Sequence, residues 1–249
     1  MSALFDSVLR LADSNLILGQ RLSEWCAKGP QMEEDVALTN VALDLIGHAN
    51  LLLGYAAEVQ GEGRDADQLA FLRDGDKFRN LLLVEQPNGD YAHTIARQLF
   101  FDAWANAWYA EMAQSSDQRL AEIAARALKE TAYHWRHSTQ WTLRLGDGTD
   151  ESHQRMQTAI DALWMYTGEM FTDDEVDVEM AKQGIMPLPS ALAPAWNKAV
   201  SAVLEEATLS MPGDQWMQSG GKQGRHTEHL GYILAEMQFL PRAYPGAAW

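Results

Sequence analysis

Four long runs of helical periodicity dominate this chain of 249 residues. Hydrophobic side chains recur every three to four positions over residues 2–27, 32–60, 90–115 and 117–145, the last with Asp117 as its expected N-cap. Within each pair of runs the break is tight. Long helices joined by short breaks predict an antiparallel four-helix bundle.

Shorter helices are expected around this core, in a segment over 76–85 and near 152–171, 190–209 and 228–243. No alternating run of β-branched residues predicts a strand, and no stretch resembles a linker or a repeat. The sequence therefore predicts one all-α domain spanning residues 1–249, with peripheral helices packed around a ferritin-like bundle.

Charge and composition restrict the class of protein. The formal net charge of −16 repels phosphate backbones, so we expect no nucleic-acid partner. Asp6 and Arg10 lie inside the first amphipathic run, which is unlike a signal peptide, and the charge-free stretch between Asp44 and Glu58 is too short to span a bilayer. A single cysteine, Cys26, permits no internal disulfide. We expect a cytoplasmic protein without a membrane partner.

Each of the four hydrophobic stripes carries polar residues near its middle. The first holds Asn15, the second His48, the third Asp102, and the fourth both Thr131 and His134. Buried polar groups at one level of a bundle tend to meet, because an unsatisfied group costs a few kcal/mol. We therefore expect these side chains to form a hydrogen-bonded network in which His48 contacts Asp102 or Asn15.

Ferritin-like di-iron bundles place a Glu on each of two helices and a Glu-x-x-His pair on each of the other two. Here both histidines stand where that scheme needs them, but Leu45 and Thr131 replace the two glutamates three positions earlier, and Asn15 replaces the carboxylate of the first helix. Only Asp102 remains a carboxylate. Because two iron ions need several anionic oxygen ligands, we interpret this as a degenerate metal site that holds no metal and has no catalytic residue.

An alternative stays open. Asp44 and Glu130 lie next to the missing glutamates, and Glu130 is four residues before His134, which also places the two on one helix face. If these carboxylates turned inward, the chain would be a stand-alone di-iron oxidase with an altered site.

Several segments resemble a known family. "DLIGH" (44–48) and "KETAYH" (129–134) are similar to the metal-binding segments of bacterial multicomponent di-iron oxygenases, each with one glutamate replaced. Four further segments resemble the non-catalytic C subunit of the phenylacetyl-CoA epoxidase family: "QRLSEW" (20–25), "NLLLVEQPNGD" (80–90), "FFDAW" (100–104) and "GGKQGRHTEHLG" (220–231).

The resemblance implies a structural subunit that supports a catalytic A subunit, in a hetero-oligomer that is a dimer of heterodimers. In that family the A subunit holds the iron and epoxidises the ring of phenylacetyl-CoA in phenylacetate degradation. A reductase subunit, with flavin and an iron–sulfur cluster, supplies electrons from NADPH. No cofactor is implied for this chain, and whether the chain itself is an enzyme stays open.

Two basic clusters stand out because basic residues are scarce. Lys77 and Arg79 form one with Arg73, and Lys222 and Arg225 form the other in a glycine-rich loop. Either could contact the phosphates of an acyl-CoA, although we favour a surface of salt bridges as the explanation of both clusters. A third hypothesis, an acyl-CoA-binding module without chemistry, rests on these residues.

The densest group of histidine and acid is "HTEH" (226–229), which contains His226, Glu228 and His229. Two histidines and one glutamate lack the fourth ligand of a structural zinc site. We expect these residues to serve packing or a subunit interface.

Overall fold

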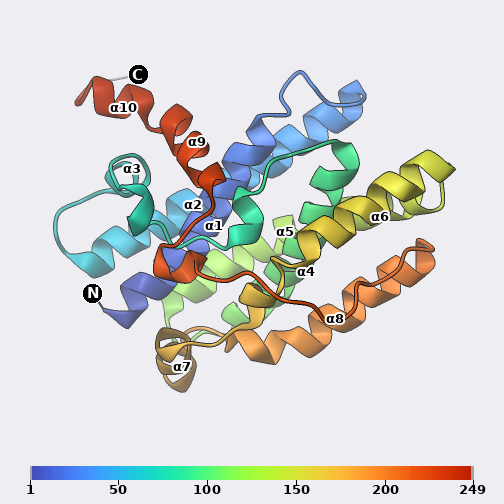
Figure 1. The fold of residues 1–249 in the computed structure, drawn as a ribbon. Coiled ribbons are helices and arrows are strands. Elements are labelled where there is room, and N and C mark those ends of the chain that lie inside the picture. The colour runs from blue at the N-terminus through green and yellow to red at the C-terminus, as the bar shows by residue number, and fades with distance from the viewer. Residues whose placement is uncertain (1, 248–249) are drawn as a thin grey trace. The chain divides into compact units, whose positions relative to one another are not determined.

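The computed structural model describes residues 2–247, and these contain ten α-helices and no strand (Figure 1). The prediction of an all-α, ferritin-like fold is confirmed. The described chain divides into two compact units, a first unit made of the residues up to Pro87 and from Gly220 onward, and a second unit, Asn88–Ser219. The single domain expected over 1–249 stays a prediction.

The first unit is built on two long helices, α1 (Ala3–Ser23) and α2 (Met32–Gln60), which pack along each other. The helix α1 begins where the Ser2 side chain accepts a hydrogen bond from the Phe5 amide. The helix α2 ends at Gly61, whose φ of +68° is a left-handed conformation that glycine adopts without strain. The expected end of the first helix at Ala27 is wrong, because the α-helix stops at Ser23 and a series of turns follows it.

Within residues 2–247, α2 is the one helix long and apolar enough to cross a membrane by length and composition alone. Its charge-free stretch is short, but one window of 18 residues in this helix is apolar enough to meet the limits. A core helix of a soluble protein passes the same test, and α1 covers one side of α2.

Shorter elements complete the first unit. They are α3 (Ala66–Phe71), the 3-10 turns η1 (Gly75–Lys77), η2 (Leu82–Glu85) and η4 (Gly221–Gln223), and the helices α9 (Glu228–Met237) and α10 (Phe239–Ala243). The helical segment expected over 76–85 is thus two short turns. The helix expected over 228–243 is broken at Gln238, whose buried side chain leaves the helical pattern to donate to the carbonyls of Ala70 and Arg73.

The second unit is built around α4 (Tyr91–Met112), which packs against three other helices. These and the remaining elements are α5 (Gln118–Gly146), α6 (Asp150–Trp164), η3 (Gly168–Phe171), α7 (Glu175–Lys182) and α8 (Pro189–Glu206). Asp117 caps α5 as expected, by accepting a bond from the Leu120 amide. The helix expected over 152–171 ends early, at Trp164, and α7 was not anticipated.

The buried side of α5 drifts along its length. Continued at the same spacing, the stripe of Thr131 and His134 predicts that Ser138, Trp141 and Leu145 are buried. Ser138 is buried, but near the C-terminus Thr142 and Gly146 are buried in place of Trp141 and Leu145. A straight helix drifts relative to a repeat of 3.5 residues, so a stripe counted over 29 residues changes face. Gly146 suits this contact, because a Cβ there would lie 2.4 Å from the Ala207 carbonyl oxygen.

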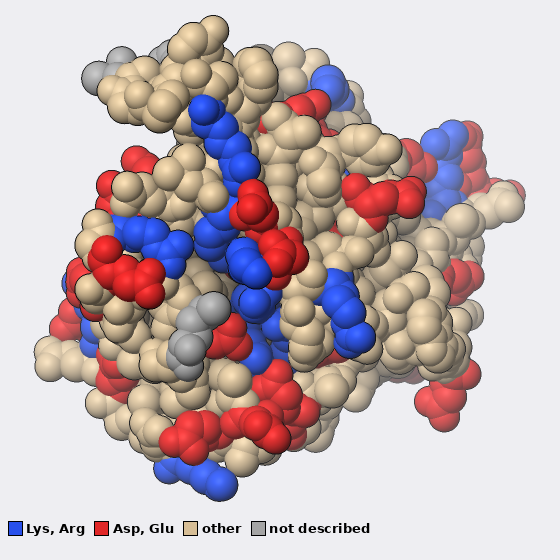
Figure 2. Space-filling model, turned by 60° about the vertical axis from the view of Figure 1, so that its left-hand side comes forward, with Lys and Arg blue, Asp and Glu red and all other residues tan. Residues whose placement is uncertain are grey.

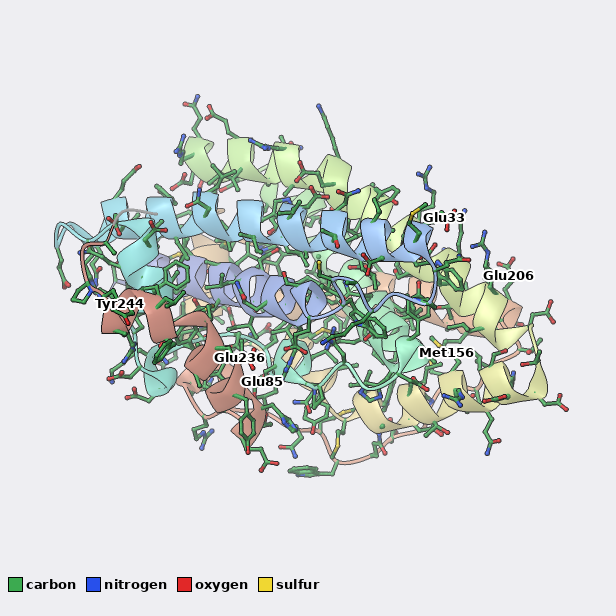
Figure 3. The ribbon with its side chains drawn as sticks, turned by 90° about the horizontal axis from the view of Figure 1, so that it is seen from above. Glu33, Glu85, Met156, Glu206, Glu236 and Tyr244 are labelled. Atoms are coloured by element: carbon green, nitrogen blue, oxygen red, sulfur yellow. The ribbon has the colours of Figure 1, made fainter. Side chains whose placement is uncertain are left out.

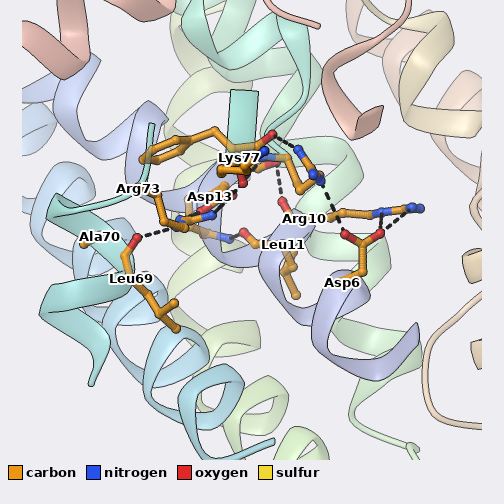
Figure 4. Close-up of polar contacts among 12 residues, drawn as sticks. Asp6, Arg10, Leu11, Asp13, Leu69, Ala70, Arg73 and Lys77 are labelled. Atoms are coloured by element: carbon orange, nitrogen blue, oxygen red, sulfur yellow. Dashed lines mark hydrogen bonds and ion pairs between the residues drawn. The ribbon is translucent and has the colours of Figure 1, made fainter. Parts of the chain in front are cut away.

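A buried ion pair ties α1 to the segment after α3 (Figure 4). The Asp13 side chain is 0% exposed, and its carboxylate accepts bonds from both terminal nitrogens of Arg73, one of them at 2.9 Å. The Arg79 backbone N–H donates to the same carboxylate at 2.8 Å. Because several donors satisfy this buried charge, the pair fixes the path of residues 73–79 over α1.

We predict that Arg73→Met lowers the free energy of unfolding by about 3–5 kcal/mol, because it leaves the Asp13 carboxylate buried without its counter-ion. Urea unfolding measures the loss. The double variant Asp13→Leu, Arg73→Met should recover much of it, since no buried charge is then left. The control Arg155→Met breaks an exposed pair with Asp90 and Glu151 and should change little. Equal losses in the single and double variants would contradict the argument.

Candidate functional site

The first unit holds three of the positions that correspond to a di-iron site. Asn15 lies on α1, and Leu45 and His48 lie on α2, and all three are at most 1% exposed. The Asn15 amide nitrogen donates to the Leu11 carbonyl oxygen, one turn earlier in the same helix, at 2.7 Å. Asn15 is therefore bound to its own helix through this nitrogen, and the predicted contact of His48 with Asn15 or Asp102 stays a prediction.

The second unit holds the other three positions, Asp102 on α4 and Thr131 and His134 on α5, each at most 2% exposed. The Thr131 hydroxyl donates to the Leu128 carbonyl oxygen of its own helix at 3.3 Å. Asp102 lies close enough to His134 and Ser138 for both to affect its ionisation. Asp102 and His134 thus lie close together inside this unit.

Burial dominates the ionisation of Asp102. The loss of hydration raises the pKa of its carboxyl group to about 6, although the charges of His134 and Arg97 and a hydrogen bond with Ser138 act in the opposite direction. Gln98 also donates to the carboxylate, at a long 3.4 Å. The only carboxylate on the four predicted stripes therefore holds its proton more tightly than an ordinary aspartate.

The two carboxylates beside the missing glutamates are only partly buried. On α5, Glu130 faces Arg126 across one helical turn at 3.8 Å. Across residues 2–247, no group of three or more His, Cys, Asp or Glu side chains is arranged to hold a metal ion.

The two basic clusters, more than 140 residues apart in the chain, converge on the first unit. A Cβ on Gly224 would lie 2.6 Å from an Arg79 guanidinium nitrogen and 2.3 Å from the Asp76 carbonyl oxygen, so glycine permits this contact. Figure 2 shows a face on which Lys and Arg side chains form a band bordered by acidic ones.

Internal partners already bind much of this basic surface. Lys77 pairs with Asp76 at 2.6 Å, and Arg79 contacts Asp6 at 3.4 Å. Lys222 is buried, whereas Arg225 is exposed. The geometry brings Arg79 to the loop that contains Lys222 and Arg225. The role of the four residues predicted to contact an acyl-CoA stays a prediction.

His226 is held inside the first unit, together with a residue that the sequence analysis missed. Its Nδ1 lies 2.9 Å from a carboxylate oxygen of Glu85, and its Nε2 lies 3.1 Å from the Phe78 carbonyl oxygen. Glu85 is fully buried and also accepts bonds from Asn80 and from the Thr227 amide. The sequence could have indicated this residue, because Glu85 is the one charged residue in the apolar run that precedes the segment PNGD (87–90).

Both ring nitrogens of His226 face acceptors, so both must donate, and the ring is the imidazolium. Burial lowers its pKa, but the hydrogen bond and charge of Glu85, with the Phe78 carbonyl, outweigh burial and raise the pKa above its ordinary value. Glu228 is exposed and His229 half-buried at the start of α9. Of the three residues expected to serve packing or an interface, His226 makes an internal clamp.

We predict that His226 makes the stability fall as the solution becomes alkaline. Because its folded pKa is raised, its stabilisation is complete below about pH 6.5 and is lost as the pH rises through the folded pKa. His226→Gln should remove this slope, which urea unfolding at pH 6.5 and pH 9 would measure. His229→Gln is the matched control and should keep it. A slope that survives in His226→Gln would refute the clamp.

The raised pKa of Asp102 predicts the opposite dependence of stability on the group's ionisation. A raised carboxyl pKa means that ionisation destabilises the folded chain, so Asp102→Asn should gain on the wild type as the pH rises. The gain approaches about 3 kcal/mol once the pH exceeds both the ordinary value of 3.8 and the folded value of about 6. Urea unfolding of both proteins between pH 4 and pH 7 tests this, because the gain develops between the ordinary and the folded pKa of the carboxyl group. A difference independent of pH would show that Asp102 is not the titrating group.

Comparison with known proteins now identifies the family. The chain matches the family described as phenylacetic acid catabolic protein over residues 1–249. It is 52% identical, over the full length of both chains, to the C subunit of the 1,2-phenylacetyl-CoA epoxidase of Escherichia coli (strain K12). The chain belongs to the phenylacetic acid catabolic protein family.

Proposed function

We propose that this chain is the non-catalytic structural subunit of a phenylacetyl-CoA epoxidase, and that it supports the catalytic A subunit of that complex. The observation that carries the proposal is the donor set on its buried stripes. Where a di-iron bundle needs carboxylates, this chain has the amide of Asn15, the hydrocarbon of Leu45 and the hydroxyl of Thr131.

These donors do not fit a pair of ferrous ions. The nitrogen of the Asn15 amide and the hydroxyl of Thr131 both donate to carbonyls of their own helices, and leucine offers no ligand. Burial of Asp102 raises the pKa of its carboxyl group to about 6, so its ionisation costs more than that of an ordinary aspartate. One carboxylate and two imidazoles leave most of the positive charge of two iron ions uncompensated.

The matching length and high identity of the relative support a role in the same kind of complex. In the proposed assembly the A subunit holds the iron and binds phenylacetyl-CoA, and a reductase with flavin and an iron–sulfur cluster delivers electrons from NADPH. A subunit that binds only the folded form of its partner raises the partner's apparent stability by mass action. We also propose that the assembly is a cytoplasmic dimer of heterodimers.

The second candidate function is a stand-alone di-iron oxidase that recruits Asp44 and Glu130. Both carboxylates would have to leave half-exposed positions, and Glu130 would lose Arg126. The third, an acyl-CoA-binding module, has in its favour the convergence of Arg79 and Arg225 near Gly224. Binding of CoA by the isolated chain would favour it.

We predict that the chain, purified alone and reconstituted anaerobically with ferrous iron, retains well under one iron per chain after desalting. Elemental analysis gives the ratio, and the absence of a near-ultraviolet oxo-bridge absorption after exposure to air is a second readout. About two irons per chain, lost in His48→Ala or His134→Ala, would overturn the proposal and assign the chemistry to this chain.

A further inference from the structure

The outward face of α2 exposes large hydrophobic side chains. Met32 is 76% exposed, Val36 54% and Leu43 61%. Scattered single hydrophobic residues are normal on a surface, but a row of them on one helix marks a contact. Inside the first unit, α1 and α3 contact other sides of the helix.

The row continues with a spacing of three and four residues. The positions in line are Val36, Asn40, Leu43, Gly47, Asn50 and Gly54. None is charged. This alternation of three and four is the spacing by which one helix presents a seam to another helix.

Contacts within this chain do not explain why glycine occupies the two helical positions Gly47 and Gly54. A Cβ on either would meet nothing within 4 Å, and neither has a positive φ. Glycine inside a helix is less stable than alanine, so open space gives no reason to keep it there. Gly19 shows how this chain uses a helical glycine: a Cβ there would lie 2.9 Å from Ile46 and 3.3 Å from the Ala42 carbonyl oxygen, where α1 crosses α2 closely.

The charges along α2 point to the kind of partner. The helix contains Glu33, Glu34, Asp35, Asp44 and Glu58 and no lysine or arginine. Glu33 projects at the N-terminal end of the helix (Figure 3). A second copy of this face would bring acidic ends together, between two chains of net charge −16 each, and such repulsion disfavours a homodimer.

We propose that the outward face of α2, from Val36 to Gly54, is the docking surface for a helix of the partner subunit. The matching helix is apolar along its contact row, approaches closely at Gly47 and Gly54, and carries lysine or arginine where it meets Glu33 and Glu58. The inference rests on the proposed function only in taking the catalytic A subunit as that partner.

The decisive variant is Gly47→Leu. It fills open space on a helix with a residue of higher helix propensity, so the isolated chain should be at least as stable as the wild type. If a helix docks there, the same side chain blocks the close approach. We expect binding to the A subunit to weaken at least tenfold, measured by biolayer interferometry with the full-length chains, while the melting temperature of the isolated chain does not fall.

Matched variants complete the test. Leu43→Arg, on the same face, should weaken binding to a similar degree. Gly231→Leu places the same change at a helical glycine of α9 that also has open space, and Val178→Arg charges an exposed aliphatic residue of α7; both should bind as the wild type does. Equal binding by Gly47→Leu and the wild type would overturn the inference and leave the proposed function standing. Failure of the wild type to bind the A subunit would overturn both.

Three other results would also overturn the proposal. A lower melting temperature of isolated Leu43→Arg would show that the chain itself covers this face. A wild-type homodimer in light scattering that Gly47→Leu dissociates would assign the face to a second copy. Binding of the wild type to phosphatidylcholine vesicles, lost in Leu43→Arg, would assign it to a membrane.

Discussion

The buried carboxylate of Asp13 organises the first unit, because so much of the chain depends on satisfying it. Arg73 and the Arg79 amide bind it, and the guanidinium of Arg73 also reaches the Lys77 carbonyl oxygen at 3.0 Å and stacks over the Phe78 ring at 4.3 Å. The segment 73–79 is thereby fixed on α1. Phe78 can then present its carbonyl to His226.

The clamp between His226 and Glu85 extends this order to the C-terminal part of the unit. Arg21 on α1 donates two bonds to the Glu85 backbone carbonyl, and the Glu85 side chain binds His226 and the Thr227 amide at the start of α9. Buried charges cost stability unless they are paired and hydrogen-bonded, so each one here imposes a defined path on a loop. Buried polar groups thus fix the paths of the loops, which the hydrophobic packing of α1 and α2 does not specify.

In the second unit the same physics has a different outcome. Asp102 lies beside His134 and Ser138, but burial still raises its pKa, which means that its partners only partly replace the lost water. A di-iron protein would compensate such carboxylates with metal ions. In the proposed structural subunit His134 and Ser138 compensate part of the charge of the Asp102 carboxylate. In the same proposal, the outward face of α2 carries the interaction with the partner.

The sequence by itself determined the four long helices. The period of 3.6 residues predicted both long pairs, the cap at Asp117 and the burial of Asn15, His48, Asp102 and His134, because these depend on local backbone geometry and on which face is apolar. The period could not predict which residues of α5 are buried near Gly146, since small drifts accumulate over many turns. Only the tertiary structure decided that Glu85 binds His226, that Gln238 breaks the last helix, and that Asp76 and Arg79 meet Gly224. Contacts between residues so far apart are selected by packing and by the cost of buried polar groups, which local periodicity does not encode.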